Sequence, residues 1–324
     1  MRSRVRSVMA HPRPAAPPSA LADRAVAVYG RAGRFDYPAP AARTIFAESL
    51  LQLIEAIDGE VRPLVLIEGD RLTEGDLELA GRLQDLSCRP LLAVLAVDNA
   101  FETAVIAARR LGLGRVLPGD CLLRPAELKR WIGWFEAGGP EPGLAAHLEA
   151  GSAIERRAVA APSDKQSGAD DALAFVQTLR DDPSFLFDFR LILEEAMNNC
   201  ILHAFGDDAV ATSLAESPSR RFAPDDGIWI QWGADERTIA VAVSDNRGAL
   251  TRDRILSKIE RQVTIKGVLD ESGRGIYLIH ALAARAIFNL RPGRLTETVA
   301  LFPRKADGWG DLGSPRPILI FDGS

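Results

Sequence analysis

The feature that most constrains the fold is an alternation of short apolar runs with amphipathic stretches, which extends from residue 24 to residue 137. The runs RAVAVYG, RPLVLIEG and PLLAVLAV have the length and composition of buried strands. The stretches between them have helical spacing, and AARTIFAESLLQLIEAI, residues 41–57, is predicted as one helix. Strands that alternate with helices of this length pair in parallel. Residues 24–137 are therefore predicted to form a small doubly wound α/β domain.

The pattern changes in residues 138–170, which are rich in Gly, Pro, Ser and mixed charge and are predicted to be a linker. Residues 171–324 are then predicted to form a second domain, while residues 1–23 are predicted to be a disordered tail. The second domain has a different order of elements, with a helix at 171–181, a long helix at 186–205, a hairpin in GIWIQWGADERTIAVAVSD, helices at 252–260 and 275–286, and a strand pair in AIFNLRPGRLTETVALF. Helices on one face of a mixed or antiparallel sheet indicate an α+β domain.

Composition narrows the classes of function. Of the 324 residues 47% are hydrophobic and 26% are charged, which is typical of a globular protein that buries a sizeable core. The net charge of -5 argues against a nucleic-acid-binding surface, which needs clustered positive charge. Cys88, Cys121 and Cys200 are scattered without a CxxC pair, and no apolar run has the length of a membrane span. We expect a cytoplasmic protein that binds neither nucleic acid nor membrane.

The rhythm of residues 24–137 resembles the receiver domain of bacterial response regulators, including a last strand followed by LLRPAEL, where that family has Lys-Pro. A receiver needs an aspartate at the end of its third strand to attack a phosphoryl donor, and nearby acidic residues to hold Mg²⁺. Here that strand ends in Glu68, and the lysine position is Arg124. The resemblance implies a degenerate receiver-like module for partner binding or dimerisation, with Glu68 interpreted as a solvated strand end. An unrelated α/β domain is the alternative.

Polar residues follow one face of the long helix predicted in the second domain. The segment LILEEAMNNCILHAFG places Glu195, Asn199 and His203 at four-residue intervals in an otherwise apolar run. Residues four apart share a helix face, so a carboxylate, an amide and an imidazole would form one stripe. By itself such a stripe is most simply a solvated edge of the helix.

Two glycine-containing segments follow this helix in the sequence. VAVSDNRGALT ends an apolar strand with Asp245 and continues into a loop that contains Gly248. DESGRGIYLIHALA places Gly273 and Gly275 at the start of an amphipathic helix. A GxG before a helix is common by chance, so neither segment is specific alone. Their order and spacing after the polar helix are more specific.

Over residues 171–303 the chain resembles the GHKL ATPase fold of gyrase, heat-shock chaperones and histidine kinases. In particular it is similar to the anti-sigma-factor serine kinases of bacterial partner switching, whose N-box has the form ExxxNxxxH followed by a small and an aromatic residue. EEAMNNCILHAF matches this N-box, and ESGRGIYLI is similar to the family's second glycine box. The resemblance implies an α+β GHKL domain that binds ATP with Mg²⁺.

The resemblance also implies roles for the residues of the N-box. The side-chain oxygen of Asn199 would be a ligand of Mg²⁺, which prefers oxygen donors. Glu195 would take the proton from an attacking serine hydroxyl or water. His203 is expected to be a packed supporting residue, and Cys200 is expected to belong to the core because it faces away from the stripe.

The remaining site residues would bind the nucleotide. Asp245 would accept a hydrogen bond from the adenine amine, which would exclude guanine. Gly273 and Gly275 would let backbone N–H groups approach the phosphates at a helix N-terminus. Arg274, or Lys266 in the preceding loop, would contact the terminal phosphate. Residues 249–272 would form a lid that orders on nucleotide binding. The register that would place Thr296 or Thr298 near the adenine is left open.

The first glycine box departs from the family pattern, and this departure distinguishes the alternative functions. The first glycine box usually reads Asp-x-Gly-x-Gly, and this chain has Arg247 and Ala249 at the glycine positions, with Gly248 between them. A bulky Arg would narrow the pocket if its backbone needed a glycine conformation. One hypothesis is a serine or threonine protein kinase acting on a small antagonist protein, with a sigma factor as a second partner and homodimerisation left open. The alternative is a catalytically silent scaffold.

A histidine kinase is a third hypothesis. Such an enzyme needs a phosphoacceptor histidine on a long dimerising helix before the ATPase domain. The only candidate is His147 in GLAAHLEAGSA, a short segment without a heptad pattern.

Overall fold

The structure is a computed structural model that describes residues 24–30, 43–97, 100–204, 222, 226–264, 274–305 and 316–323. In its N-terminal half five strands alternate with four α-helices: β1 Ala25–Tyr29, β2 Arg43–Ala47, α1 Leu50–Ile57, β3 Leu64–Glu68, α2 Glu74–Arg82, β4 Leu91–Ala96, α3 Phe101–Arg110, β5 Arg115–Pro118 and α4 Pro125–Ala137. The strands are parallel and lie in the order β2-β1-β3-β4-β5. This is the flavodoxin-like doubly wound order.

Local sequence explains these elements. The runs LVLIE of β3 and LLAVLA of β4 are buried throughout, as expected of strands covered on both faces. Helix α2 begins at a capping box in which the Thr73 side chain accepts from the Asp76 backbone N–H. The single helix predicted over residues 41–57 is wrong. Its first part is the edge strand β2, and Ser49 caps a shorter helix α1.

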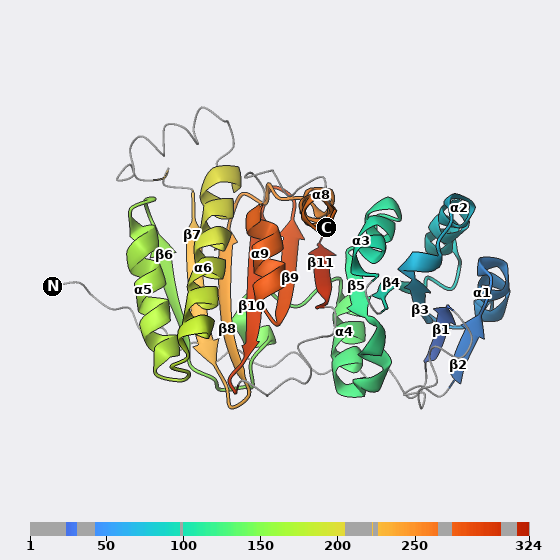
Figure 1. The fold of residues 1–324 in the computed structure, drawn as a ribbon, viewed down its shortest axis with the longest axis horizontal. Helices are drawn as coiled ribbons and strands as arrows, with labels where there is room; N and C mark the ends of the chain where they lie inside the picture. Colours follow the sequence, from blue (N-terminus) through green and yellow to red (C-terminus); the bar gives the residue numbers. More distant parts are fainter. Residues whose placement is uncertain are drawn as a thin grey trace.

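The C-terminal half contains β6 Ile154–Val159, α5 Asp164–Gln177, α6 Pro183–Ala204, β7 Ile228–Ala234, β8 Thr238–Asp245, α8 Arg252–Val263, α9 Arg274–Leu282, β9 Arg285–Arg291, β10 Leu295–Pro303 and β11 Ile318–Asp322. Strands β6, β7, β8, β10 and β9 are antiparallel neighbours, in that order. Helices α5, α6, α9 and α8 lie together on one face of this sheet (Figure 1). The predicted α+β arrangement is thus observed. Residues 138–170, predicted to be a linker, include β6 and the first half of α5.

The two halves share one sheet because of β11, a strand that the sequence interpretation missed. β11 pairs with β9 in parallel and with β5 in antiparallel, so the described residues form a continuous eleven-stranded sheet (Figure 1). The backbones of Gly114 and Ile320 approach closely, and the Ile320 N–H donates to the Gly114 carbonyl at 2.7 Å. A Cβ at position 114 would lie 2.4 Å from the Ile320 carbonyl oxygen, so this junction requires glycine.

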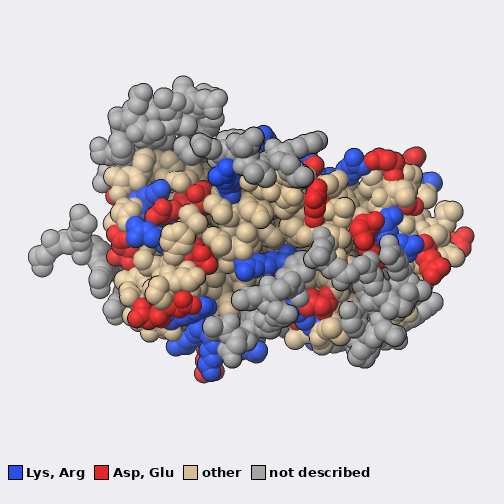
Figure 2. All heavy atoms as spheres, viewed as in Figure 1, with Lys and Arg blue, Asp and Glu red and all other residues tan. Residues whose placement is uncertain are grey.

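The core lies on both faces of the sheet. Helices α1, α3, α5, α6, α8 and α9 pack on one face. On the other face α4 and the segment that follows it reach across to the C-terminal strands, with Trp131, Ile132 and Leu144 in one buried cluster with Val299 and Phe321. On the face of the molecule in Figure 2, acidic and basic side chains are interspersed. None of the described helices is long and apolar enough to cross a membrane.

Candidate functional site

Helix α6 carries the predicted polar stripe beside its buried face. Phe189, Leu193, Ala196 and Cys200 recur at three- and four-residue spacing and are buried against the sheet. Glu195 and Asn199 lie one turn apart and are only partly buried. The predicted stripe therefore lies at the margin of the helix–sheet interface. His203 is within α6, but its side chain lies outside the described residues.

Glu195 lies against the amino-terminal end of α9. A Cβ atom added to Gly275 would come within 2.3 Å of the Glu195 Oε2 atom, so the carboxylate occupies the space left by this glycine. Arg274, the first residue of α9, is exposed. Gly273, Lys266 and the rest of the loop before α9 lie outside the described residues. The structure therefore brings Glu195 and Gly275 together, as the sequence predicts for two parts of one site.

Two lysines that the sequence interpretation did not assign lie near Glu195. Burial raises the pKa of Glu195, Glu194 raises it further, and the positive charges of Lys165 and Lys258 lower it. Burial lowers the pKa of Lys258, and the Glu195 charge opposes that effect. The Lys165 Nζ atom donates to Asn198 Oδ1 at 2.9 Å. Lysine is rare in this sequence. Apart from that rarity, no feature of the sequence marked these two lysines as candidate site residues.

Asp245 ends β8 in a buried position, with 2% of its surface exposed. Its Oδ1 atom accepts hydrogen bonds from the backbone N–H groups of Arg247 at 2.9 Å and Gly248 at 3.0 Å. Burial raises the pKa of Asp245, and these two donors oppose the increase. The Oδ1 atom is therefore committed to the turn.

Two further residues surround Asp245. Thr296 is its register partner on β10, so of Thr296 and Thr298 it is Thr296 that lies opposite Asp245. The Cys200 thiol of α6 hydrogen-bonds to the Asp245 carboxylate, and Cys200 is 2% exposed. The expectation that Cys200 belongs to the core is confirmed, although its contact with Asp245 was missed. A cysteine in an apolar helix face gives no sequence signal for such a contact.

The departures from the first glycine box do not force a glycine conformation on Arg247. Gly248 has a φ of 60°, and a Cβ there would lie 2.2 Å from the Arg291 carbonyl oxygen, so the requirement for glycine falls on position 248. Arg247 is not among the described residues with a left-handed backbone, and its Nε atom donates to Asp226 Oδ1 at 2.6 Å. Ala249 is exposed. The glycine-only backbone at position 247, on which the expected narrowing of the pocket depended, is therefore absent.

The described residues include donors of the kinds that a nucleotide with its own cation needs. Among them no group of three or more His, Cys, Asp and Glu side chains could hold a metal ion. Asn199 offers one amide oxygen, which is a suitable ligand for Mg²⁺ when phosphate oxygens and waters supply the others. The helix terminus at Gly275 offers backbone N–H groups to an anion. The donor set thus fits ATP with Mg²⁺.

The prediction that Glu68 is a solvated strand end is wrong. Glu68 is fully buried, with 0% of its surface exposed, because the short 3₁₀ helix Gly69–Arg71 turns the chain against α3. A Cβ at Gly69 would lie 2.6 Å from the Ala104 Cα atom, which shows how closely α3 covers this end. Arg124 pairs with Asp120 at 2.5 Å.

The position of His147 does not suit a phosphoacceptor. It follows the three-residue 3₁₀ helix Leu144–Ala146, is 4% exposed, and has its ring centroid 5.3 Å from that of Trp134. Burial lowers the pKa of His147 to about 3. A side chain buried in this way cannot reach the phosphate of a nucleotide without local unfolding.

Comparison with known proteins gives one family. Residues 156–299 match the family model described as the histidine kinase-like ATPase domain. The matched segment runs from β6 to β10 and includes Glu195, Asn199, Asp245 and Gly275. This part of the chain is accordingly a GHKL-type ATPase domain, and the expectation is confirmed at that level. No curated protein matches the chain.

Proposed function

We propose that the protein binds ATP with Mg²⁺ at the site described above and transfers the terminal phosphoryl group to a serine or threonine of a small antagonist protein. The observation that carries this proposal is the contact between Glu195 and Gly275. This contact places a partly buried carboxylate against a helix N-terminus, which can bind phosphate. A general base for phosphoryl transfer has to lie close to the phosphate in this way.

The nucleotide would lie between α6, α9 and the end of β8. Asp245 Oδ2 would accept from the adenine amine, while Oδ1 keeps the turn to Gly248 in place. Asn199 would hold the cation through its amide oxygen. When bound, ATP with Mg²⁺ supplies the activated phosphoryl group and neutralises charge on its oxygens.

Glu195 would accept the proton of the attacking hydroxyl. Burial raises the pKa of Glu195, which makes the carboxylate a stronger base, and the positive charges of Lys165 and Lys258 oppose that increase. Water can replace the protein hydroxyl, so slow ATP hydrolysis is expected when no substrate is present. This provides an assay that needs no knowledge of the antagonist protein.

The test compares wild type with Glu195→Ala, Asn199→Ala and the exposed control Glu78→Ala on α2. Calorimetry with Mg²⁺ should show ATP affinity reduced about tenfold or more in Asn199→Ala, since a bond to a charged partner is lost. Glu195→Ala should retain binding and lose about 100-fold in hydrolysis rate. Absence of ATP binding by the wild type, with Asn199→Ala indistinguishable from it, would contradict the proposal.

A further inference from the structure

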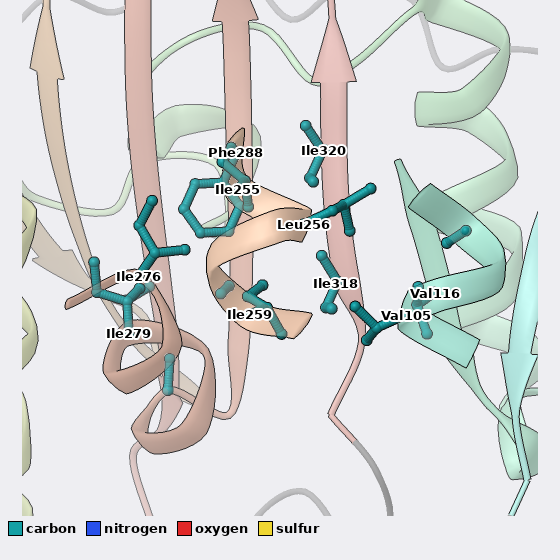
Figure 3. Close-up of a cluster of buried hydrophobic side chains, with 14 of the residues drawn as sticks. Val105, Val116, Ile255, Leu256, Ile259, Ile276, Ile279, Phe288, Ile318 and Ile320 are labelled. Carbon is teal, nitrogen blue, oxygen red and sulfur yellow. The ribbon is translucent and has the colours of Figure 1, made fainter. Parts of the chain in front are cut away.

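Helix α8 connects the two halves of the protein. Its buried stripe consists of Ile255, Leu256 and Ile259. This stripe packs on α3, β11 and α9, where the buried residues are Val105, Ile318, Ile320, Ile276 and Ile279 (Figure 3). The helix that follows the first glycine box is therefore packed against the N-terminal half as well as against its own domain. Its position depends on residues from both halves.

One side chain of the N-terminal half holds α8 at two points. Arg109, near the end of α3, places Nε 2.8 Å from Asp253 Oδ1 and Nη1 2.9 Å from Glu260 Oε2. The two acids are seven residues apart, which is about two helical turns, so they project from the same side of α8. The planar fork of the guanidinium can satisfy both. Arg109 thus links α3 to α8 at two points on the same side of α8.

Lys258 lies on the opposite flank of the buried stripe. From Asp253 to Lys258 the helix turns by about 140°, so the lysine points away from Arg109. Its side chain is partly buried and acts on Glu195. The buried stripe of α8 also packs on α9, which begins against Glu195, while Lys258 on the far flank contributes a positive charge that lowers the pKa of Glu195.

We propose that Arg109 is a positioning residue of the nucleotide site, which keeps α8 packed against α9 and Lys258 on the flank that faces away from α3, so that the N-terminal half completes the site of the C-terminal half. This inference rests on the proposed function. The N-terminal half is then a structural part of the ATPase site, and any partner that displaces α3 would change its activity.

The test uses Arg109→Ala, Arg109→Lys and the control Arg110→Ala. Arg110 is the next residue on α3 and pairs with Glu74 within the N-terminal half. We expect Arg109→Ala to lower the rate of ATP hydrolysis about tenfold and the ATP affinity less, with Arg109→Lys intermediate because one ammonium cannot hold both acids. Arg110→Ala should resemble the wild type. Faster hydrogen exchange of the α8 amides in Arg109→Ala should accompany the loss of activity.

The pH profile distinguishes positioning from general loosening. The charged groups that act on Glu195 are Glu194 on its own helix, Lys165 of α5 and Lys258 of α8. Withdrawal of Lys258 removes a positive charge, so the acidic limb of the hydrolysis profile of Arg109→Ala should move to higher pH. The triple variant Arg109→Glu, Asp253→Arg, Glu260→Arg should restore both the rate and this limb.

The outcomes separate the two proposals. If wild type and Arg110→Ala bind ATP, and Arg109→Ala hydrolyses it at the same rate with the same pH profile, the positioning role is overturned while the proposed function stands. If neither wild type nor Arg110→Ala binds ATP, the proposed function fails and the positioning role fails with it. A slow Arg109→Ala variant whose acidic limb is unchanged would also contradict the positioning role.

Discussion

The Glu195 carboxylate occupies the space in which a side chain at Gly275 would begin, since a Cβ there would lie 2.3 Å from Oε2. The atom in the way is the end of a flexible side chain, so a substitution can be accommodated by moving the carboxylate. Position 275 therefore links the geometry of the proposed base to the start of α9.

Gly275→Ala is expected to fold normally and to lose activity. Alanine is favoured over glycine in helices by roughly 1 kcal/mol, so the free energy of unfolding should not fall. The displaced carboxylate should lower the ATP hydrolysis rate about 10- to 100-fold. Gly81→Ala on α2 is the matched control, because a Cβ there meets nothing within 4 Å. Equal hydrolysis rates for the two variants would contradict the assigned role of the contact.

Gly248→Ala, in contrast to Gly275→Ala, is expected to destabilise the fold. Its Cβ would lie 2.2 Å from the Arg291 carbonyl oxygen and 2.7 Å from the Arg294 backbone N atom, at a residue whose φ is 60°. Backbone atoms cannot move aside cheaply, so we expect a loss of about 2 kcal/mol or more in the free energy of unfolding. Urea denaturation measures this loss. A variant as stable as wild type would show that the turn after Asp245 can rearrange.

Cys200→Ala tests the contact between the thiol and Asp245. Loss of one donor to a buried carboxylate costs about 1 kcal/mol, so the ATP affinity should fall about fivefold, and Cys200→Ser should retain most of it. Cys121→Ala removes a second buried thiol, on the other face of the sheet, and should leave affinity unchanged. Calorimetry at fixed Mg²⁺ compares the three. Equal losses in Cys200→Ala and Cys121→Ala would assign the effect to packing alone.

The burial of His147 is expected to make the folded protein less stable at acidic pH. Burial lowers its pKa to about 3 in the folded state, against an ordinary value of 6.5. The unfolded chain therefore binds a proton that the folded chain excludes, so stability is complete above pH 6.5 and falls as the pH drops below it. The loss is about 1.4 kcal/mol per pH unit while the folded state stays neutral.

His147→Phe should remove most of that loss without a large change at pH 7.5. Neither ring nitrogen of His147 has a hydrogen-bond partner among the described residues, so an apolar ring can take its place. We expect the stability difference between pH 6.5 and pH 5 to shrink by about 2 kcal/mol, measured by urea denaturation. His280, which is also buried and has its pKa lowered to about 4, remains and adds its own acid sensitivity to both proteins. An unchanged pH dependence would mean that His147 is accessible to protons in the folded protein.

Much of the candidate site was predictable because its parts are local. The four-residue spacing of Glu195 and Asn199 defines a stripe on any helix, and the glycine at 275 precedes a helical pattern. The identity of the critical glycine in the first box was less accessible. The family pattern directed attention to Arg247 and Ala249, whereas the left-handed backbone is at Gly248 and depends on the approach of the Arg291 and Arg294 backbone.

The short strand β2 was missed for a related reason. Residues 43–47 continue smoothly into the apolar pattern of α1, and only pairing with β1 makes them a strand. Likewise Glu68 was interpreted as solvated because a charged residue that ends a strand usually is. Its burial follows from the packing of α3 over Gly69, a contact between residues far apart in the chain.

The sequence by itself determined the alternation that makes the N-terminal sheet parallel, the α+β order of the second half and the polar stripe of α6, since each is a property of neighbouring residues. Tertiary packing, by contrast, determines that β11 joins the two halves into one sheet, that Cys200 and Thr296 lie beside Asp245, and that Arg109 pairs with Asp253 and Glu260 of α8. These relationships join residues up to two hundred positions apart. They depend on strand register and helix packing, which no local pattern specifies.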